Sequence, residues 1–320
     1  MAIPGGCRRD AFRPLRVSCT AALLAAVLGF LASCATAPQR VVDYTDASRE
    51  FGVLDGGALV YFSVDIPAAR PILDLVSFGG TSGKQAAQIL DRTETAVGAA
   101  YPPESGRRYL LAAQGRYPKS GIDFSLTFNP SWKKLKSDRG IRYWHSERDS
   151  LSLLIEPRYA LISDGGLFAG PGRVTVPDAF WNIREGAALA GWLEDAAVPI
   201  NRFLGQLEIP IQVPADRLIF AVFPEAGPPL VYSALLRLET PSVSQAKALA
   251  SMVSMIRLFV GRPPANRPSV EGSADSLPDL IAALFANTPV QDDTALILKT
   301  ASLDAEAIAL LFTMFSVYSN

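Results

Sequence analysis

The sequence predicts an α+β fold in which antiparallel sheets carry helices packed on one face, arranged as two modules. Short runs rich in β-branched and aromatic residues alternate with Gly, Pro and Asp turn signals, which is typical of strands joined by tight turns. Between these runs, apolar residues recur at spacings of three and four, which predicts helices. Each half of the chain contains a strand, a broken pair of helices and returning strands, so we expect two modules of similar organisation.

The first module is predicted to cover residues 56–176. An apolar, β-branched run predicts a strand over 58–66, and the pattern that follows predicts helices over 67–77 and 84–100. Apolar residues alternate with polar ones from Ile122 to Phe128, which predicts a strand with one buried and one solvated face. The remaining expected elements are a partner strand at 108–117, a meander of 142–147, 151–156 and 159–164, and a Gly/Pro-rich connector over 165–177.

The second module is predicted to cover residues 177–320. Large apolar residues such as Trp181 and Trp192 anchor its first helical stretches, and Pro241 suits the first position of a later helix. The expected helices are 178–195, 198–206, 241–260, 277–285 and 304–318. The expected strands are 218–223 and 230–239, which form a hairpin, and 294–300, with a Pro/Ser/Gly-rich loop over 262–276.

The first 34 residues have the layout of an export signal. Four arginines lead into an uncharged stretch rich in Ala and Leu, from Val17 to Cys34, which is short for a membrane-spanning helix of about 20 apolar residues. The stretch ends on Leu31-Ala32-Ser33-Cys34, which resembles the lipobox of bacterial lipoproteins. The alternatives are a plain signal peptide with a chance cysteine, or an uncleaved N-terminal anchor.

The lipobox resemblance implies that residues 1–33 are removed and that Cys34 becomes the acylated N-terminus. Residues 34–55 then form a tether between the anchor and the first module. A diacylglyceryl group supplies more than one acyl chain, so attachment to the bilayer is durable. Ala35 follows the cysteine where Asp would signal retention, which favours the periplasmic leaflet of the outer membrane over the inner membrane.

Composition excludes several classes of protein. All three cysteines, Cys7, Cys19 and Cys34, lie within the first 34 residues, so the processed chain has no thiol for a disulfide. Removing residues 1–33 takes away four Arg and one Asp, leaving 26 basic and 30 acidic residues and a net charge of −4. No basic tract is present, so nucleic acid is not an expected partner.

The chain offers little chemistry for a metal, cofactor or phosphate site. Its one histidine, His145, stands alone on an expected strand, and no ligand cluster accompanies it. Gly80-Thr-Ser-Gly-Lys84 resembles a phosphate-binding loop, but Gln85 replaces the required Ser or Thr, and Phe78 stands where a glycine is needed. We therefore expect no metal and no cofactor.

Serine-hydrolase chemistry is a weaker alternative. Ser131-Trp-Lys-Lys134 and Ser244-Gln-Ala-Lys247 both fit Ser-x-x-Lys, the nucleophile motif of penicillin-recognising enzymes. The companion motifs are degraded, since Gly165 replaces an Asn and Ala301 replaces a Gly. Ser131 and Lys134 are the catalytic candidates if the chain is an enzyme, whereas the main hypothesis is a protein without catalytic residues.

The C-terminal helices are unusually poor in charge. In the last of them an apolar stripe at helical spacing is formed by Ile308, Leu311, Phe312, Phe315 and Tyr318. One interpretation is that this stripe packs on a sheet. The other is that it lies in a bilayer interface or encloses a lipid. A lipid anchor would hold the stripe beside the membrane, where weak affinity acts at high effective concentration.

The sequence therefore favours a membrane-tethered, non-enzymatic envelope lipoprotein whose ligand is a lipid or the bilayer itself. The stretch Asp55-Gly-Gly-Ala-Leu-Val-Tyr-Phe62, together with the overall plan, resembles treponemal lipoproteins. That resemblance implies amphipathic helices that contact the outer membrane. The competing hypothesis is a structural or assembly module of the envelope, with protein partners that the sequence does not identify.

Overall fold

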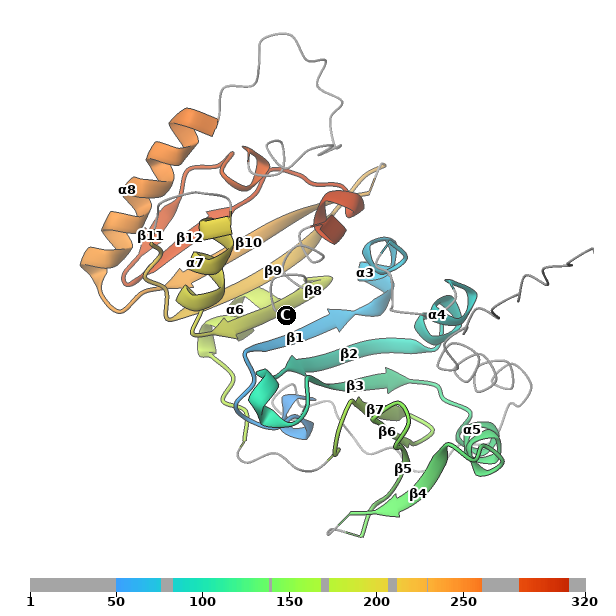
Figure 1. Ribbon diagram of the computed structural model, residues 1–320. Coiled ribbons are helices and arrows are strands. Elements are labelled where there is room, and N and C mark those ends of the chain that lie inside the picture. Colours follow the sequence, from blue (N-terminus) through green and yellow to red (C-terminus); the bar gives the residue numbers. More distant parts are fainter. Residues whose placement is uncertain are drawn as a thin grey trace, which may run out of the picture.

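The fold is α+β and is built on one antiparallel sheet (Figure 1). The computed structural model describes residues 50–75, 83–137, 140–167, 173–206, 212–228, 230–260 and 282–310. Within these ranges the sheet has twelve strands in the order β11-β12-β10-β9-β8-β1-β2-β3-β7-β6-β5-β4. The strands are β1 Val60–Asp65, β2 Thr93–Ala100, β3 Tyr109–Gly115, β4 Trp132–Lys136, β5 Arg142–Ser146, β6 Leu151–Ile155, β7 Tyr159–Ser163, β8 Leu189–Glu194, β9 Arg217–Glu225, β10 Val231–Glu239, β11 Val290–Asp292 and β12 Ala295–Lys299.

The sheet runs without a break through the expected boundary between the modules. Strand β1 pairs with β2 on one side and with β8 on the other, and Val60 lies opposite both Ala100 and Leu193. The strands of residues 56–176 therefore share a backbone hydrogen-bond network with those of residues 177–320. The division at residue 177 stays a prediction about folding units.

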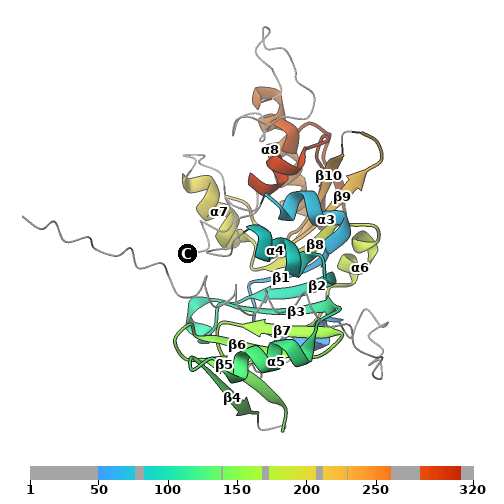
Figure 2. The ribbon, with the colours of Figure 1, turned by 90° about the vertical axis from the view of Figure 1, so that its right-hand side faces the viewer.

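Most helices cover one face of the sheet. They are α3 Ile66–Leu73, α4 Gly83–Leu90, α5 Lys119–Thr127, α6 Asp178–Arg184, α7 Ala197–Gln206 and α8 Val243–Val260. Figure 1 shows α8 beside β11 and β12 at one end of the sheet and α5 beside β4 at the other, and Figure 2 shows the arrangement turned by 90°.

The register assigns the helices to faces, because residues directly opposite in a ladder share a face. Val222, Leu189, Val64, Ala96, Ala113 and Ala160 are opposite one another in turn across six strands. The apolar clusters beneath α3, α5 and α8 all lie on this face. Helix α6 packs Phe180 against Trp192 and Ile219 on the other face.

Several sequence expectations are confirmed. The strand at 58–66, the meander of β5, β6 and β7, the hairpin of β9 and β10, and the strand at 294–300 are all present. The helices expected at 67–77, 198–206 and 241–260 correspond to α3, α7 and α8. The edge strand β4 was not expected from the sequence.

The helix expected over 84–100 is wrong in its second half. Helix α4 ends at Leu90, and β2 begins at Thr93. A Cβ on Gly98 would lie 2.3 Å from Cζ of Phe62, so this small residue lets the neighbouring strand's aromatic ring lie over the backbone. Pairing on both sides overrides the helix propensity of the alanines in β2.

The strand expected over 122–128 is also wrong, since these residues belong to α5 and its C-cap. In a helix, residues four positions apart lie on the same face. The alternating residues therefore divide into two pairs, Ile122 with Leu126 and Phe124 with Phe128. Ile122 and Leu126 are the buried residues of α5, whereas Phe124 and Phe128 are exposed and contact one another with ring centroids 4.8 Å apart.

The helix expected over 178–195 ends early as well. Helix α6 stops at Arg184, Gly186 adopts a φ of 76°, and the chain continues as the central strand β8. The loop at 262–276 lies outside the described residues, as do most of the helix expected at 277–285 and everything after residue 310. Among the described helices, none has the length and apolarity to cross a membrane.

Candidate functional site

The predicted lipid-contacting stripe is described only at its beginning. Residues 305–310 are helical, and Ile308 is 1% exposed within the apolar cluster beneath α3. Ile308 is therefore a core residue in this arrangement and does not face lipid. Leu311, Phe312, Phe315 and Tyr318 lie outside the described residues, as does the predicted lipidation residue Cys34.

The start of the last helix is firmly attached to the sheet. The backbone N–H of Ala307 donates to Oδ1 of Asp304 at 2.7 Å, which caps the helix. Leu303 and Tyr232 exchange two backbone hydrogen bonds of 2.7 Å, so the residue before the cap is tied to β10. These contacts attach residues 303–310 to the sheet.

Helix α8, the longest helix in the described part of the chain, also uses its apolar stripe for packing. Ala246, Leu249 and Val253 are buried, and the last two belong to the cluster formed with β9, β10 and β12. Its exposed side is mostly polar, and among the side chains that the structure describes there, Val243 and Met255 are exposed large apolar residues. The packing interpretation therefore holds for the inner side of α8.

An N-terminal strap, residues 50–58, crosses the opposite face of the sheet. Phe51 is buried against Phe180 and Trp192, with ring centroids 5.5 and 5.0 Å away. Glu50 forms an ion pair of 2.5 Å with Arg184. The tether expected over 34–55 overlaps this strap, because residues 50–55 pack on the face that α6 covers.

A buried ion pair holds the middle of the strap. Arg107, whose side chain is 6% exposed, pairs with Asp55 through a short contact. The hydroxyls of Tyr61 and Tyr101 both donate to the carbonyl oxygen of Asp55, at 3.2 and 3.0 Å. Burial raises the pKa of Tyr101 to about 12, so its hydroxyl stays protonated as a donor.

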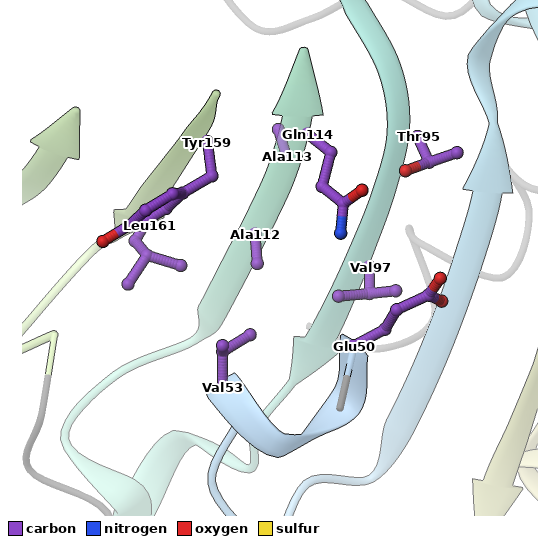
Figure 3. Close-up of a pocket in the computed structure, with 9 residues that line it drawn as sticks. All are labelled: Glu50, Val53, Thr95, Val97, Ala112, Ala113, Gln114, Tyr159 and Leu161. Carbon is purple, nitrogen blue, oxygen red and sulfur yellow. The ribbon is translucent and has the colours of Figure 1, made fainter. Parts of the chain in front are cut away.

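A small pocket lies under the strap (Figure 3). Strands β2, β3 and β7 form its floor, and the strap supplies Glu50 and Val53. Its volume of about 30 Å³ is room for one water molecule. Ligand sites usually measure roughly 300–1,000 Å³, so this pocket does not hold a lipid.

The structure places Ser131 and Lys134 on the surface rather than in a cleft. Ser131 lies in the turn before β4, where its backbone N–H donates to Oδ1 of Asn129 at 3.0 Å. Lys134 is exposed on β4, and its Nζ lies 5.1 Å from the ring centroid of Trp144. This surface cation–π contact differs from the enclosed nucleophile–base pair that acyl transfer requires.

Other sequence candidates have structural partners. Nδ1 of His145 lies 2.9 Å from Oγ of Ser152, which satisfies the ring on a strand. Among the described residues, no three His, Cys, Asp or Glu side chains gather as metal ligands. Most of the Gly80–Lys84 turn lies outside the described ranges.

Two features were missed from the sequence. The strap is the first, since the sequence predicts a tether over 34–55, which includes Phe51 and Asp55. The second is the end of the sheet at β4, where the α5 pair Phe124 and Phe128 are 56% and 71% exposed. The lysines of β4 could have marked an edge strand, because charged residues protect exposed strand edges.

In the described residues, the fold is α+β with one antiparallel sheet, most helices on one face, and α6 and the strap on the opposite face. A model of the family described as outer membrane-associated lipoprotein TP0453 matches residues 46–165. No curated protein matches the chain.

Solved structures of TP0453 are similar over most of the chain. Crystal form III has a TM-score of 0.55 at 17% identity and covers 86% of this chain and 99% of that chain. Form I has a TM-score of 0.55 at 17% identity, with 88% and 100% covered, and form IV has 0.54 at 17% identity, with 83% and 99% covered. At this identity the likeness shows the shared fold.

Proposed function

We propose that this chain is an outer membrane-associated lipoprotein that is held in the periplasmic leaflet by acylated Cys34 and works without catalysis. The main support is the match of residues 46–165 to a family with that description. The lipobox at Leu31–Cys34 supplies an independent argument, because it lies outside the matched residues. The surface positions of Ser131 and Lys134 support a non-enzymatic role.

The second part of the proposal concerns contact with lipid. Ile308 is buried in the core, so the residues that would contact the bilayer are Leu311, Phe312, Phe315 and Tyr318. Burying an aromatic side chain contributes about 1.5–3 kcal/mol, so two or three such residues give measurable partitioning. The net charge of the processed chain is −4, so this contact depends on apolar burial and little on salt.

Liposome flotation of residues 34–320 with Cys34→Ser tests lipid contact in the absence of the anchor. We expect the protein to float with vesicles and Phe315→Asp to abolish flotation while its thermal unfolding is unchanged. Thr313→Asp is the matched control, because it adds the same charge on the opposite side of the expected helix, about 160° from Phe315, and it should still float. Absence of flotation, combined with early melting of Phe315→Asp, would show that the stripe is core.

A further inference from the structure

The end of the sheet at β4 differs from the rest of the molecule in having an open edge. Strand β4 is the last in the strand order, and it lies at the lower edge of the sheet in both views (Figures 1 and 2). Its outer side has no partner strand in the described part of the chain. The opposite edge, β11, has three residues, whereas β4 has five.

The register shows which backbone groups face outward. The N–H of Ser137 donates to the carbonyl of Ile141 at 2.9 Å, so that pair is hydrogen-bonded. Bonded and non-bonded pairs alternate along an antiparallel ladder. Continuing the register makes Leu135 with Tyr143 the next bonded pair, and the N–H and C=O groups of Lys134 and Lys136 therefore point away from β5.

The side chains at this edge are basic and apolar. Residues 133, 134 and 136 are lysines, and β4 contains no acidic residue. Lys133 is paired with Glu147 at 2.8 Å, whereas Lys134 lies over Trp144. Leu135 and Phe128, both exposed, add apolar surface beside the strand.

These charges select the kind of strand that can pair. A second copy of β4 would bring lysines opposite or diagonal to lysines, and like charges across a ladder are destabilising. Lysines on an edge also discourage neutral strands. An acidic strand has neither obstacle, because each acid would lie opposite a lysine.

We propose that β4 is a docking edge for an extended acidic segment of another polypeptide, which adds to the sheet as a thirteenth, antiparallel or parallel strand. Lys134 and Lys136 share one face of β4, and Leu135 lies on the other. The partner segment therefore alternates, with acidic residues opposite the two lysines and an apolar residue opposite Leu135. This inference does not depend on acylation or on lipid contact.

The test uses a probe of defined chemistry: a capped, fluorescein-labelled heptapeptide that alternates Glu and Val. It is titrated by anisotropy into the full-length protein purified in a zwitterionic detergent, beside a matched Lys/Val peptide. We expect saturable binding of the acidic peptide alone, weakened by salt because the recognition is ionic. Hydrogen exchange of the Lys134 and Lys136 amides should slow when that peptide is bound.

A pair of substitutions separates backbone pairing from charge. Lys134→Gln removes one charge, whereas Lys134→Pro removes the same charge and the outward N–H without breaking a bond to β5. We expect the proline variant to bind at least about tenfold more weakly than the glutamine variant. Circular dichroism checks that both are folded, and amide protection in the wild type remains decisive if the proline variant is not.

Four results would overturn the proposal. The first is no saturable binding of the acidic peptide up to about 1 mM. The second is equal binding of the Lys/Val peptide. The third is equal affinity of the two Lys134 variants for the acidic peptide. The fourth is protection of these amides by phosphatidylglycerol vesicles without protection by the peptide, which would make the edge a membrane contact.

Discussion

The centre of the sheet and its β4 end share the same antiparallel pairing, but the centre is buried on both faces and the β4 end is exposed to solvent. In the centre, β8, β1 and β2 are covered on both faces, and Trp192 is stacked on Tyr61 with ring centroids 4.8 Å apart. At the β4 end, lysines and exposed phenylalanines face solvent. In the centre, small residues leave room for the side chains of neighbouring strands. At the β4 end, where the described chain has no further strand, charged residues occupy the edge.

The largest effect is expected at Gly191 in the centre. A Cβ there would lie 2.4 Å from the carbonyl oxygen of Tyr61, a backbone atom of the adjacent strand that cannot move aside. Gly191→Ala should therefore lower the free energy of unfolding by about 3 kcal/mol. In α7, Gly205 has no atom within 4 Å of its Cβ position, so Gly205→Ala should stabilise by about 0.5–1 kcal/mol. Urea unfolding measures both, and equal effects would contradict the packing of β8 against β1.

A slightly smaller effect is expected where the strap is held to the sheet. Arg107→Met leaves the Asp55 carboxylate without its buried partner, which should cost about 3 kcal/mol or somewhat less. The control is the neighbouring residue, Arg108, whose side chain is 76% exposed. Its partner Asp164 is only 7% exposed, but the carboxylate keeps the backbone N–H donors of Arg108 and Tyr109, so Arg108→Met should cost less than about 1 kcal/mol. Thermal unfolding measures the loss of stability in both variants. A larger loss for Arg108→Met than for Arg107→Met would contradict the role of the Arg107–Asp55 ion pair in holding the strap.

The smallest difference is expected between two tryptophans beneath α5. Nε1 of Trp144 donates to Oδ1 of Asp123 at 2.7 Å, whereas the buried Nε1 of Trp132 has no acceptor among the described residues. Both Trp→Phe variants lose similar volume, but only Trp144→Phe loses a hydrogen bond to a carboxylate. It should be the more destabilising by about 1–2 kcal/mol. Chemical denaturation of both variants gives the comparison, and equal losses would mean that the Trp144 bond contributes nothing.

The same contrast explains how much of the fold could be predicted from the sequence. The hairpin of β9 and β10 and the meander of β5 to β7 have local turn signals and β-branched runs, and both were predicted. The sequence predicts helices over residues 93–100 and 189–194, where the structure has β2 and β8, because their small and apolar residues carry no local strand signal. Their conformation is decided by pairing with strands distant in sequence, which a single sequence does not display.

The candidate site divides in the same way. The Cys34 motif is local, so the sequence can predict it, although its acylation stays a prediction. The burial of Ile308 depends on α3 and β10, which are far away in the chain. The strap cannot be predicted from local sequence, because Phe51 is buried by Phe180 and Trp192, which are distant in the chain.

The most direct test of the account is the state of Cys34 in cells. We predict that labelled fatty acid is incorporated into the wild type, that intact mass places the mature N-terminus at Cys34, and that the protein fractionates with the outer membrane. Cys34→Ser should carry no label and should be either released from membranes or retained as the uncleaved precursor. A Cys34→Ser protein that still incorporates fatty acid, or a wild type whose N-terminus lies elsewhere without acylation, would contradict the account.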